Sequence, residues 1–212
     1  MTRILDGRLR DALSGIDANA LVKEFLSDDG AVTTVAEGCH RISLWANSLS
    51  EADPNNPAAP FLFEMQRASH DVTALLALSL YVPAAAAMRA MCETSLYYSY
   101  FRTHPAELCS LVTRPDFFIS KAEILAFHKQ HSRYYRKGAQ GLGIPGTLDI
   151  WYSKVSAIIH GQLPGAWGKR LALADTKHVA PLLKDAVSTF SEGVGKCPSS
   201  FAHSVMGRSE EG

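Results

Sequence analysis

Apolar side chains recur every three or four positions along most of the chain, which is the period of an amphipathic α-helix. The clearest run steps through Val32, Val35, Cys39, Ile42, Ala46 and Leu49. These positions share one face of a helix of about five turns. An earlier segment, 9–25, follows a similar pattern and ends at the polar stretch 27–30. The Pro- and Asn-rich segment 51–60 is then predicted to be a loop, because it cannot continue a helix.

Further helical patterns follow at 61–81, 83–102, 120–137 and 148–160, and again from Val179 onward. Pro83 suits the first position of its helix, and Ser120 with Glu123 has the spacing of a capping box. Segment 138–146 is predicted to be a loop because of its glycines and proline, whereas 107–118 fits either a short helix or a turn. No segment alternates strictly between apolar and polar residues, so no sheet is expected.

These patterns predict an all-α protein, a single-domain helical bundle of six to eight helices. Within it we expect an N-terminal helical pair over 1–59, a helical bundle over 60–197 and a flexible Ser- and Gly-rich tail over 198–212. A length of 212 residues and a hydrophobic content of 47% suffice for a core. They exclude intrinsic disorder over most of the chain.

Charge and targeting signals narrow the function classes. The 21 basic residues equal the 21 acidic ones, which argues against a generally basic nucleic-acid-binding coat or a polybasic membrane binder. The N-terminus is charged and does not resemble a secretory signal. The longest uncharged run, 72–88, is broken by Pro83 and is shorter than the ~20 residues of a membrane span. We therefore expect a cytoplasmic protein without membrane binding, whose cysteines are small hydrophobic residues rather than disulfides.

The first candidate for chemistry is a polar stripe on the apolar helix 148–160. Ser153, Ser156 and His160 fall within about 60° of one another around that helix. Polar groups that face a core need hydrogen-bond partners. His160 is either a capping or core histidine that a neighbour satisfies, favoured by the helix dipole and by Gly161, or it belongs to an active site.

The second candidate is the pair Arg89 and Glu93, which are four positions apart and share a helix face. Their apolar neighbours indicate that this face is at least half buried, and a buried charged pair is costly unless it is well satisfied. The pair is either a structural or surface ion pair, or part of a functional site. We predict that Arg89, Glu93 and His160 lie within side-chain reach, because two polar stripes on apolar helices best satisfy each other.

The third candidate is the basic and aromatic segment 121–137. Basic residues interleaved with aromatic ones suit phosphate contacts and base stacking. The nucleic-acid-binding candidates are Lys129, Arg133, Tyr134, Arg136 and Lys137. The alternative is a solvated helix face. His128 and His131 have no third ligand at a matching spacing, so no metal and no cofactor are expected.

Two segments together carry a resemblance to a known family. One is the stretch 82–93, VPAAAAMRAMCE, which continues to Tyr97 and Tyr98, and the other begins at Trp151 and ends in Ser156-Ala-Ile-Ile-His160-Gly161. An Arg/Glu helix followed by a helix that ends in Ser-x-x-x-His-Gly resembles the HEPN-like superfamily. These are small all-α domains common in bacterial defence and toxin–antitoxin systems. The resemblance covers about residues 60–195.

The resemblance implies a metal-independent endoribonuclease that works as a homodimer. Its signature is an Arg, four to six intervening residues and a His, and that His would be His160 as general acid/base. This chain has no Arg in that window, where Lys154 is the basic residue. The electrostatic stabiliser would then be Lys154 or, from another helix, Arg89. Glu93 would orient His160 or Arg89, and Ser156 would lie in the same site.

Three hypotheses follow. The first is an endoribonuclease of the HEPN-like type that acts on RNA, as a toxin or in defence. The second is a non-catalytic binding or assembly module that engages a protein partner or an antitoxin. The third is a helical regulator with a ligand in its core. If the stripe of Ser153, Ser156 and His160 lines an open cleft near Arg89, the first hypothesis is favoured, whereas a stripe sealed in the core favours the second and a roomy closed cavity the third.

Overall fold

The computed structural model of the chain describes the backbone of residues 2–131, 144–168 and 172–206. The predicted all-α bundle is confirmed, and no strand occurs in the part of the chain that is described. The helices are α1 (Thr2–Ser14), α2 (Ala18–Leu26), α3 (Asp29–Ala52), α4 (Pro60–Ala77), α5 (Tyr81–Phe101), α6 (Pro105–Thr113), α7 (Lys121–His131), α9 (Ile144–Ile159) and α10 (Ala180–Met206), with a short 3-10 helix, η1 (Leu173–Asp175), before α10.

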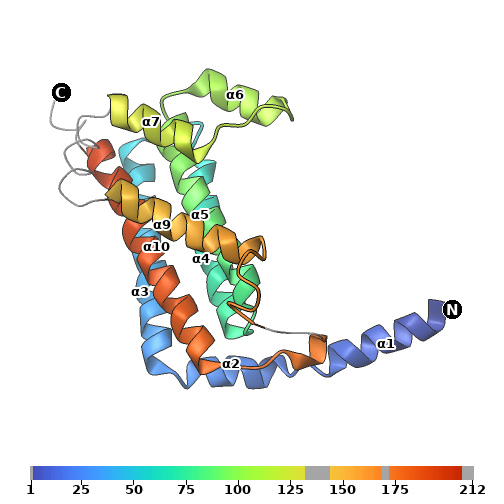
Figure 1. The fold of residues 1–212 in the computed structure, drawn as a ribbon. Helices are drawn as coiled ribbons and strands as arrows, with labels where there is room; N and C mark the ends of the chain where they lie inside the picture. The colour runs from blue at the N-terminus through green and yellow to red at the C-terminus, as the bar shows by residue number, and fades with distance from the viewer. Residues whose placement is uncertain (1, 132–143, 169–171, 207–212) are drawn as a thin grey trace.

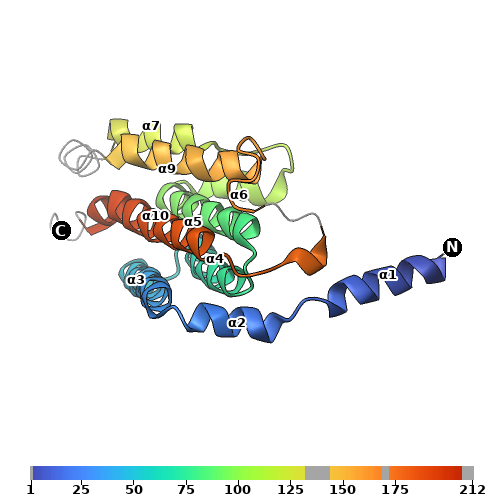
Figure 2. The ribbon, with the colours of Figure 1, turned by 60° about the horizontal axis from the view of Figure 1, so that its bottom comes forward.

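Helix α5 lies at the centre of the bundle, with α4, α9 and α10 packed along it (Figures 1 and 2). A helix surrounded in this way is apolar on most sides, which explains why its sequence is rich in alanine and has no single apolar face. Met88, Cys92 and Leu96 are among its buried residues. The charged residues Arg89 and Glu93 interrupt this apolar sequence, so their surroundings decide what they do.

Close approaches to glycine fix the helices around α5. A Cβ atom at Gly38 of α3 would lie 2.6 Å from the ring of Phe190 on α10. A Cβ atom at Gly193 of α10 would overlap the indole of Trp151 on α9. The same indole donates a 2.7 Å hydrogen bond from Nε1 to the carbonyl of Thr189. Helix α9 is therefore locked onto α10, and its opposite side is held against α5.

The N-terminal segment differs from the predicted helical pair, because 1–59 contains three helices. The apolar stripe over 9–25 is broken between α1 and α2, where the Asp17 carboxylate accepts a 2.9 Å hydrogen bond from the amide of Ala20 and caps a new helix. Helix α3 packs against α4 and α10. The buried residues of α3 thus join the same core as those of 60–197.

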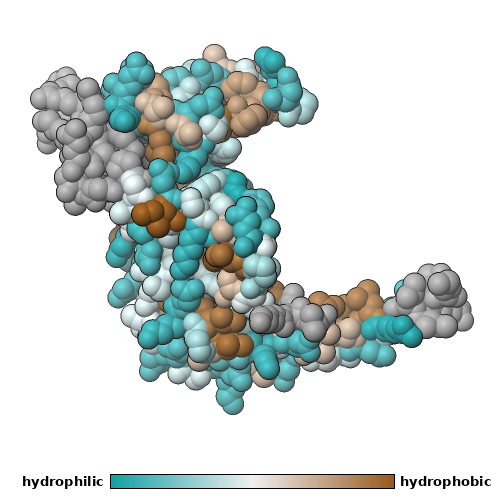
Figure 3. Space-filling view, in the orientation of Figure 1, coloured by the Kyte–Doolittle hydropathy of each residue, from teal (hydrophilic) through white to brown (hydrophobic). Residues whose placement is uncertain are grey.

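Helix α1 projects from the body of the molecule (Figures 1 and 2) and contacts η1. Its apolar residues Leu9 and Leu13 are exposed, and Figure 3 shows hydrophobic surface along this helix. Helix α2, which follows α1, packs against the body of the molecule, since its residues Leu21 and Phe25 are buried.

Several helix boundaries differ from the predicted ones. Helix α4 ends at Ala77 rather than near Tyr81, since the chain turns at Ser79 with a positive φ of 55°. Helix α5 begins at Tyr81, and Pro83 fits in its first turn, where amides have no helical acceptor. Helix α10 continues to Met206, through Pro198 and into the expected tail. The proline removes only one hydrogen bond, and the helix resumes beyond it.

Helix α7 is described up to His131, so the predicted continuation to 137 lies outside the described residues. Helix α9 begins at Ile144 rather than at Leu148, and α6 occupies part of the segment 107–118. Among the described residues, no helix combines the length and hydrophobicity that a membrane span requires.

Candidate active site

The expected proximity of Arg89, Glu93 and His160 is confirmed. On α5, Nε of Arg89 donates a 2.9 Å hydrogen bond to Oε1 of Glu93. The two residues are one helical turn apart and form an ion pair. Nη1 of the same guanidinium lies 3.2 Å from Nε2 of His160, which directly follows α9. The contact therefore joins the two helices that pack side by side in Figure 1.

The contact with Arg89 fixes the protonation of His160 in this arrangement. A guanidinium has only donors, so Nε2 of His160 must be the acceptor. The ring is then neutral and carries its proton on Nδ1. His160 is exposed, and the side chain of Arg89 is 29% exposed. Solvent or a ligand can therefore reach both groups.

The end of α9 places His160 at this position. The amide of His160 donates to the carbonyl of Ser156, which completes the last helical turn. Gly161 then adopts a φ of 66°, and the amide of Gln162 donates back to the carbonyl of Ala157. Glycine is the residue that most readily adopts this left-handed conformation at a helix end. The predicted C-cap at Gly161 is confirmed, and it leaves the imidazole at the rim of the α5–α9 contact.

Tyr152 is a site residue that the sequence predictions missed. Its hydroxyl donates a 2.5 Å hydrogen bond to Oε1 of Glu93, the oxygen that also accepts from Arg89. The Arg89 guanidinium lies 5.0 Å from the ring centroid of Tyr152, and the Lys121 ammonium lies 4.6 Å from it, both within cation–π range. Burial raises the pKa of Tyr152, and the bond to Glu93 raises it further.

A sequence signal for Tyr152 did exist. Tyr152, Ser156 and His160 are spaced by four positions, so they follow one face of α9. Because its ring is apolar and only its hydroxyl is polar, a tyrosine also suits the apolar face of a helix. The structure places that hydroxyl on the same carboxylate as the guanidinium.

Helix α7 brings a second cation to the site. Lys121 forms an ion pair with Asp149 of α9. The predicted capping box at the start of α7 is confirmed: the Glu123 carboxylate accepts from the Ser120 amide at 2.8 Å, and the Glu123 amide donates to Ser120 Oγ at 3.2 Å. The Ser120 hydroxyl also donates to this carboxylate, and the hydrogen bonds that the carboxylate accepts from the Ser120 hydroxyl and amide lower the pKa of Glu123. The cap fixes the first turn of α7, and with it the position of Lys121.

A surface cleft of about 280 Å³ adjoins these residues. Arg89, Glu93 and Tyr152 are among its lining residues. The rest of the lining comes from α5, α7 and the segment between α6 and α7, namely Leu96, Tyr97, Phe118, Ile119, Ser120, Lys121 and Ile124. Arg89, Glu93 and Tyr152 of the α5–α9 contact thus border an open cleft, which His160 does not line.

The other predicted site residues do not belong to the hydrogen-bonded group of Arg89, Glu93, Tyr152 and His160. Lys154 donates hydrogen bonds to Asp185 at 2.9 Å and to Thr189 at 3.0 Å, so it faces α10. Ser156 Oγ is buried and has no hydrogen-bond partner among the described residues. Of the predicted nucleic-acid-binding residues, Lys129 lies exposed on α7. The other four predicted binding residues lie outside the described part of the chain: Arg133, Tyr134, Arg136 and Lys137.

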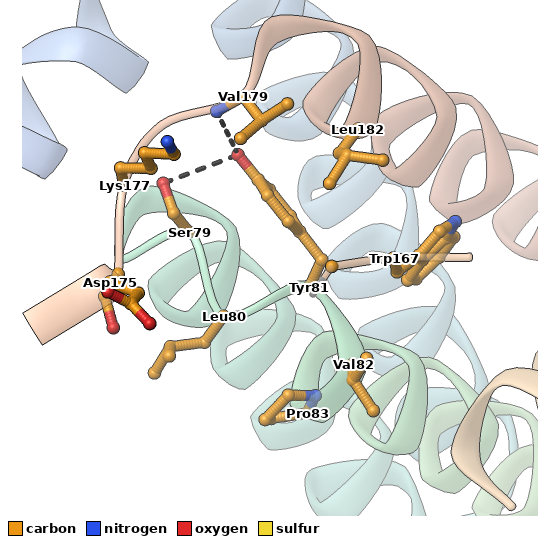
Figure 4. A pocket seen from close by; sticks show the side chains of 12 residues that line it. Ser79, Leu80, Tyr81, Val82, Pro83, Trp167, Asp175, Lys177, Val179 and Leu182 are labelled. Carbon is orange, nitrogen blue, oxygen red and sulfur yellow. Dashed lines mark hydrogen bonds between the residues drawn. The ribbon is translucent and has the colours of Figure 1, made fainter. Parts of the chain in front are cut away.

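A second pocket, of about 290 Å³, lies at the other end of α5 and shares no lining residue with the cleft. Tyr81 points into it, and its hydroxyl lies 3.4 Å from both Ser79 Oγ and the amide of Val179 (Figure 4). Asp175 and Lys177 are exposed at its edge. These contacts tie the α4–α5 turn to the start of α10, a structural role that accounts for the buried Tyr81 hydroxyl.

Among the described residues, no group of three or more His, Cys, Asp and Glu side chains is arranged to hold a metal ion. No protein-family model, curated protein or solved structure matches the chain. The likeness to HEPN-like proteins remains a hypothesis from the sequence, and the geometry of the α5–α9 contact is the basis for a function.

Proposed function

We propose that the α5–α9 contact is the active site of a metal-independent endoribonuclease of the HEPN-like type. The observation that carries this proposal is the 3.2 Å contact between Nη1 of Arg89, which lines an open cleft, and Nε2 of the exposed His160. It provides a proton acceptor beside a permanent cation, which is the pair that RNA cleavage without a metal requires. The resemblance adds the setting, bacterial defence or a toxin, and a homodimer.

In this mechanism His160 begins as the neutral base. Once the substrate displaces the Arg89 N–H from Nε2, this nitrogen takes the proton from a ribose 2′-hydroxyl, and the 2′ oxygen attacks the adjacent phosphorus. The new P–O2′ bond forms as the P–O5′ bond breaks, which leaves a 2′,3′-cyclic phosphate and a 5′-hydroxyl. The proton taken up by the imidazole is available to the departing O5′. A nucleic acid without the 2′-hydroxyl has no nucleophile, so DNA resists cleavage.

Arg89 supplies the charge that this step needs. A guanidinium has five N–H donors, and the bonds to Glu93 and His160 engage two of its nitrogens. The remaining N–H groups can donate to the phosphorus oxygens, where negative charge grows in the transition state. Glu93 holds the guanidinium from one side, and Tyr152 holds the carboxylate of Glu93. In this proposal Arg89, and not Lys154, is the electrostatic stabiliser.

The test is cleavage of single-stranded RNA by chelator-treated protein, with DNA of the same sequence beside it. We expect RNA to be cut to cyclic-phosphate products and DNA to remain intact. His160→Ala should lower the rate by about 10²–10⁴-fold, the usual contribution of general acid–base catalysis. His70→Ala is the matched control, because His70 is an exposed histidine on α4 outside the site. Cleavage that persists in His160→Ala would exclude this site.

One observation favours the alternative, a non-catalytic binding or assembly module. The cations of α5, α7 and α9 nearest the α5–α9 contact are each paired with a carboxylate: Arg89 with Glu93, Lys121 with Asp149 and Lys154 with Asp185. Such pairing also suits a clamp between helices. The same assay separates the two functions, since a clamp predicts no cleavage by the wild type and a loss of folding stability in Arg89→Ala.

A further inference from the structure

The cleft beside Arg89 combines two kinds of lining residue. Arg89 and Glu93 form the ion pair already described, and Lys121 adds a second cation that is paired with Asp149. The remaining lining is mostly apolar and aromatic, with Leu96 and Tyr97 from α5, Ile124 from α7 and Phe118 from the preceding segment. A ligand that fits this cleft therefore needs a flat or apolar part joined to an anionic part.

Phe118 is unusual for so large an apolar residue, because it is 75% exposed. It precedes the capping box of α7, and the Ser120 hydroxyl donates a 2.6 Å hydrogen bond to Glu123 there. Tyr97 stands on the α5 side of the cleft, and its ring packs 5.5 Å from that of Phe61 and 5.7 Å from that of Phe101. The cleft is thus bordered by one exposed aromatic ring and one that its neighbours hold in place.

We propose that this cleft binds an unpaired nucleobase of single-stranded RNA, with Phe118 as its stacking surface. The inference rests on the proposed function and specifies how that site holds its substrate. Every nucleobase has a π face that can stack on an aromatic side chain, so the cleft accepts bases of any sequence. Arg89 lines the cleft and also contacts His160, so a base in the cleft directs its adjoining phosphate toward these two residues.

The same geometry selects single strands over duplexes. A base in a duplex is stacked on both faces and paired along its edge, so it cannot enter a side cleft without being displaced. An unpaired base enters without that cost. Double-stranded RNA should therefore bind weakly and resist cleavage.

Binding can be measured separately from cleavage with an oligonucleotide that the proposed enzyme cannot cut. The probe is a fluorescein-labelled uridine decamer with 2′-O-methyl sugars, and its partner is an abasic decamer with the same backbone and charge. Base stacking on one aromatic residue corresponds to a preference of about tenfold. We expect wild-type protein to prefer the uridine decamer by about that factor, Phe118→Ala to lose the preference, and Phe118→Tyr to keep it.

Val112→Ala is the matched control, because Val112 is a 77% exposed apolar residue on α6 that does not line the cleft. Equal binding of the two decamers by the wild type, or a preference that survives in Phe118→Ala, would overturn the proposal. So would a dimer that dissociates in Phe118→Ala by sedimentation, with no decamer bound, because Phe118 would then be a protein contact. RNA cleavage without a base preference would refute the base subsite alone, and base-dependent binding without cleavage would refute the proposed enzyme alone.

Discussion

Two histidines connect α5 to a neighbouring helix, and their surroundings are opposite. His128 of α7 is 4% exposed, and its Nε2 lies 2.9 Å from the hydroxyl of Ser99 on α5. His160 at the end of α9 is exposed, and its Nε2 lies 3.2 Å from the guanidinium of Arg89 on α5. In both histidines Nε2 contacts a polar group of α5. That group is a neutral hydroxyl for His128 and a cation for His160.

The α5–α7 contact around His128 is built from packed rings. Phe127 lies edge-on to Tyr100 at 5.2 Å and to His104 at 4.7 Å, and Tyr100 stacks on His104 at 4.1 Å. Burial, with a smaller contribution from the nearby His104, lowers the pKa of His128 to about 4. His128 is therefore neutral near pH 7 and shielded from any substrate.

The difference shows that a histidine paired across helices is not by itself a catalytic residue. The α5–α9 contact gives His160 access from solvent and a permanent cation 3.2 Å from its Nε2, whereas His128 is buried and its Nε2 meets a hydroxyl. Substitutions at the two contacts test whether these differences separate chemistry from packing.

The largest effect on RNA cleavage in this comparison is expected from Arg89, one of the two candidate cations. Arg89→Ala should lower RNA cleavage by about 10²–10³-fold, the loss typical when one stabilising donor is removed from a transition state. Lys154→Ala should change it by less than about twofold, because Lys154 is engaged by Asp185 and Thr189 on α10. Rates with chelator-treated protein and one RNA measure both. The reverse order would assign the site to Lys154 and the α9–α10 contact.

The second prediction concerns the buried histidine and folding stability. The pKa of His128 is about 4 in the folded protein, while an unfolded histidine titrates near 6.5. The unfolded chain therefore binds more protons between these values, so stability falls as the pH is lowered from about 6.5 to about 4. The contribution lost is about 3 kcal/mol, or roughly two orders of magnitude in the folding equilibrium.

Urea unfolding at several pH values between 7.5 and 4 measures this loss. His128→Gln is the informative variant, because it keeps a polar side chain for Ser99 but does not titrate. The variant should show a flatter dependence on pH than the wild type. Equal slopes would mean that other groups cause the loss.

Much of the fold could be predicted from the sequence, because helical periodicity indicates directly which residues are buried. The stripe from Val32 to Leu49 became the buried face of α3, where Val35, Ile42 and Leu49 lie inside. The errors fell where local chemistry overrides periodicity. Asp17 caps a new helix within an apparently continuous stripe, and α10 continues through Pro198 despite the lost hydrogen bond.

The residues of the candidate site could be predicted from the sequence only in part, for a different reason. Arg89, Glu93 and His160 were detectable because charged and ionisable residues on apolar helices need partners. Lys154 shared that signal but faces α10, since sequence spacing gives the face of a helix and not the neighbour across it. Tyr152 was hidden because its apolar ring suits the core, while its hydroxyl serves the carboxylate of Glu93.

The smallest effect, and the sharpest test of positioning, is expected from Tyr152. Tyr152→Phe removes the hydroxyl that donates to Glu93 and keeps the ring beside Arg89 and Lys121. The Glu93 carboxylate still accepts a hydrogen bond from Arg89, but one of the two hydrogen bonds that fix its orientation is lost. Because small misplacement of a stabilising group lowers the rate of the chemical step, we expect kcat to fall by about three- to tenfold while KM for RNA stays close to that of the wild type.

Tyr81→Phe is the matched control, since it removes a buried hydroxyl at the other end of α5, in the second pocket. It should leave both kcat and KM unchanged. Urea unfolding of Tyr152→Phe separates positioning from packing, because a role in packing would lower stability without a selective fall in kcat. Unchanged kcat in Tyr152→Phe would mean that Glu93 alone holds Arg89 toward His160. The active part of the α5–α9 contact would then be limited to the guanidinium and the imidazole, and Tyr152 would resemble Ser99, a helix-to-helix hydrogen bond with no role in the reaction.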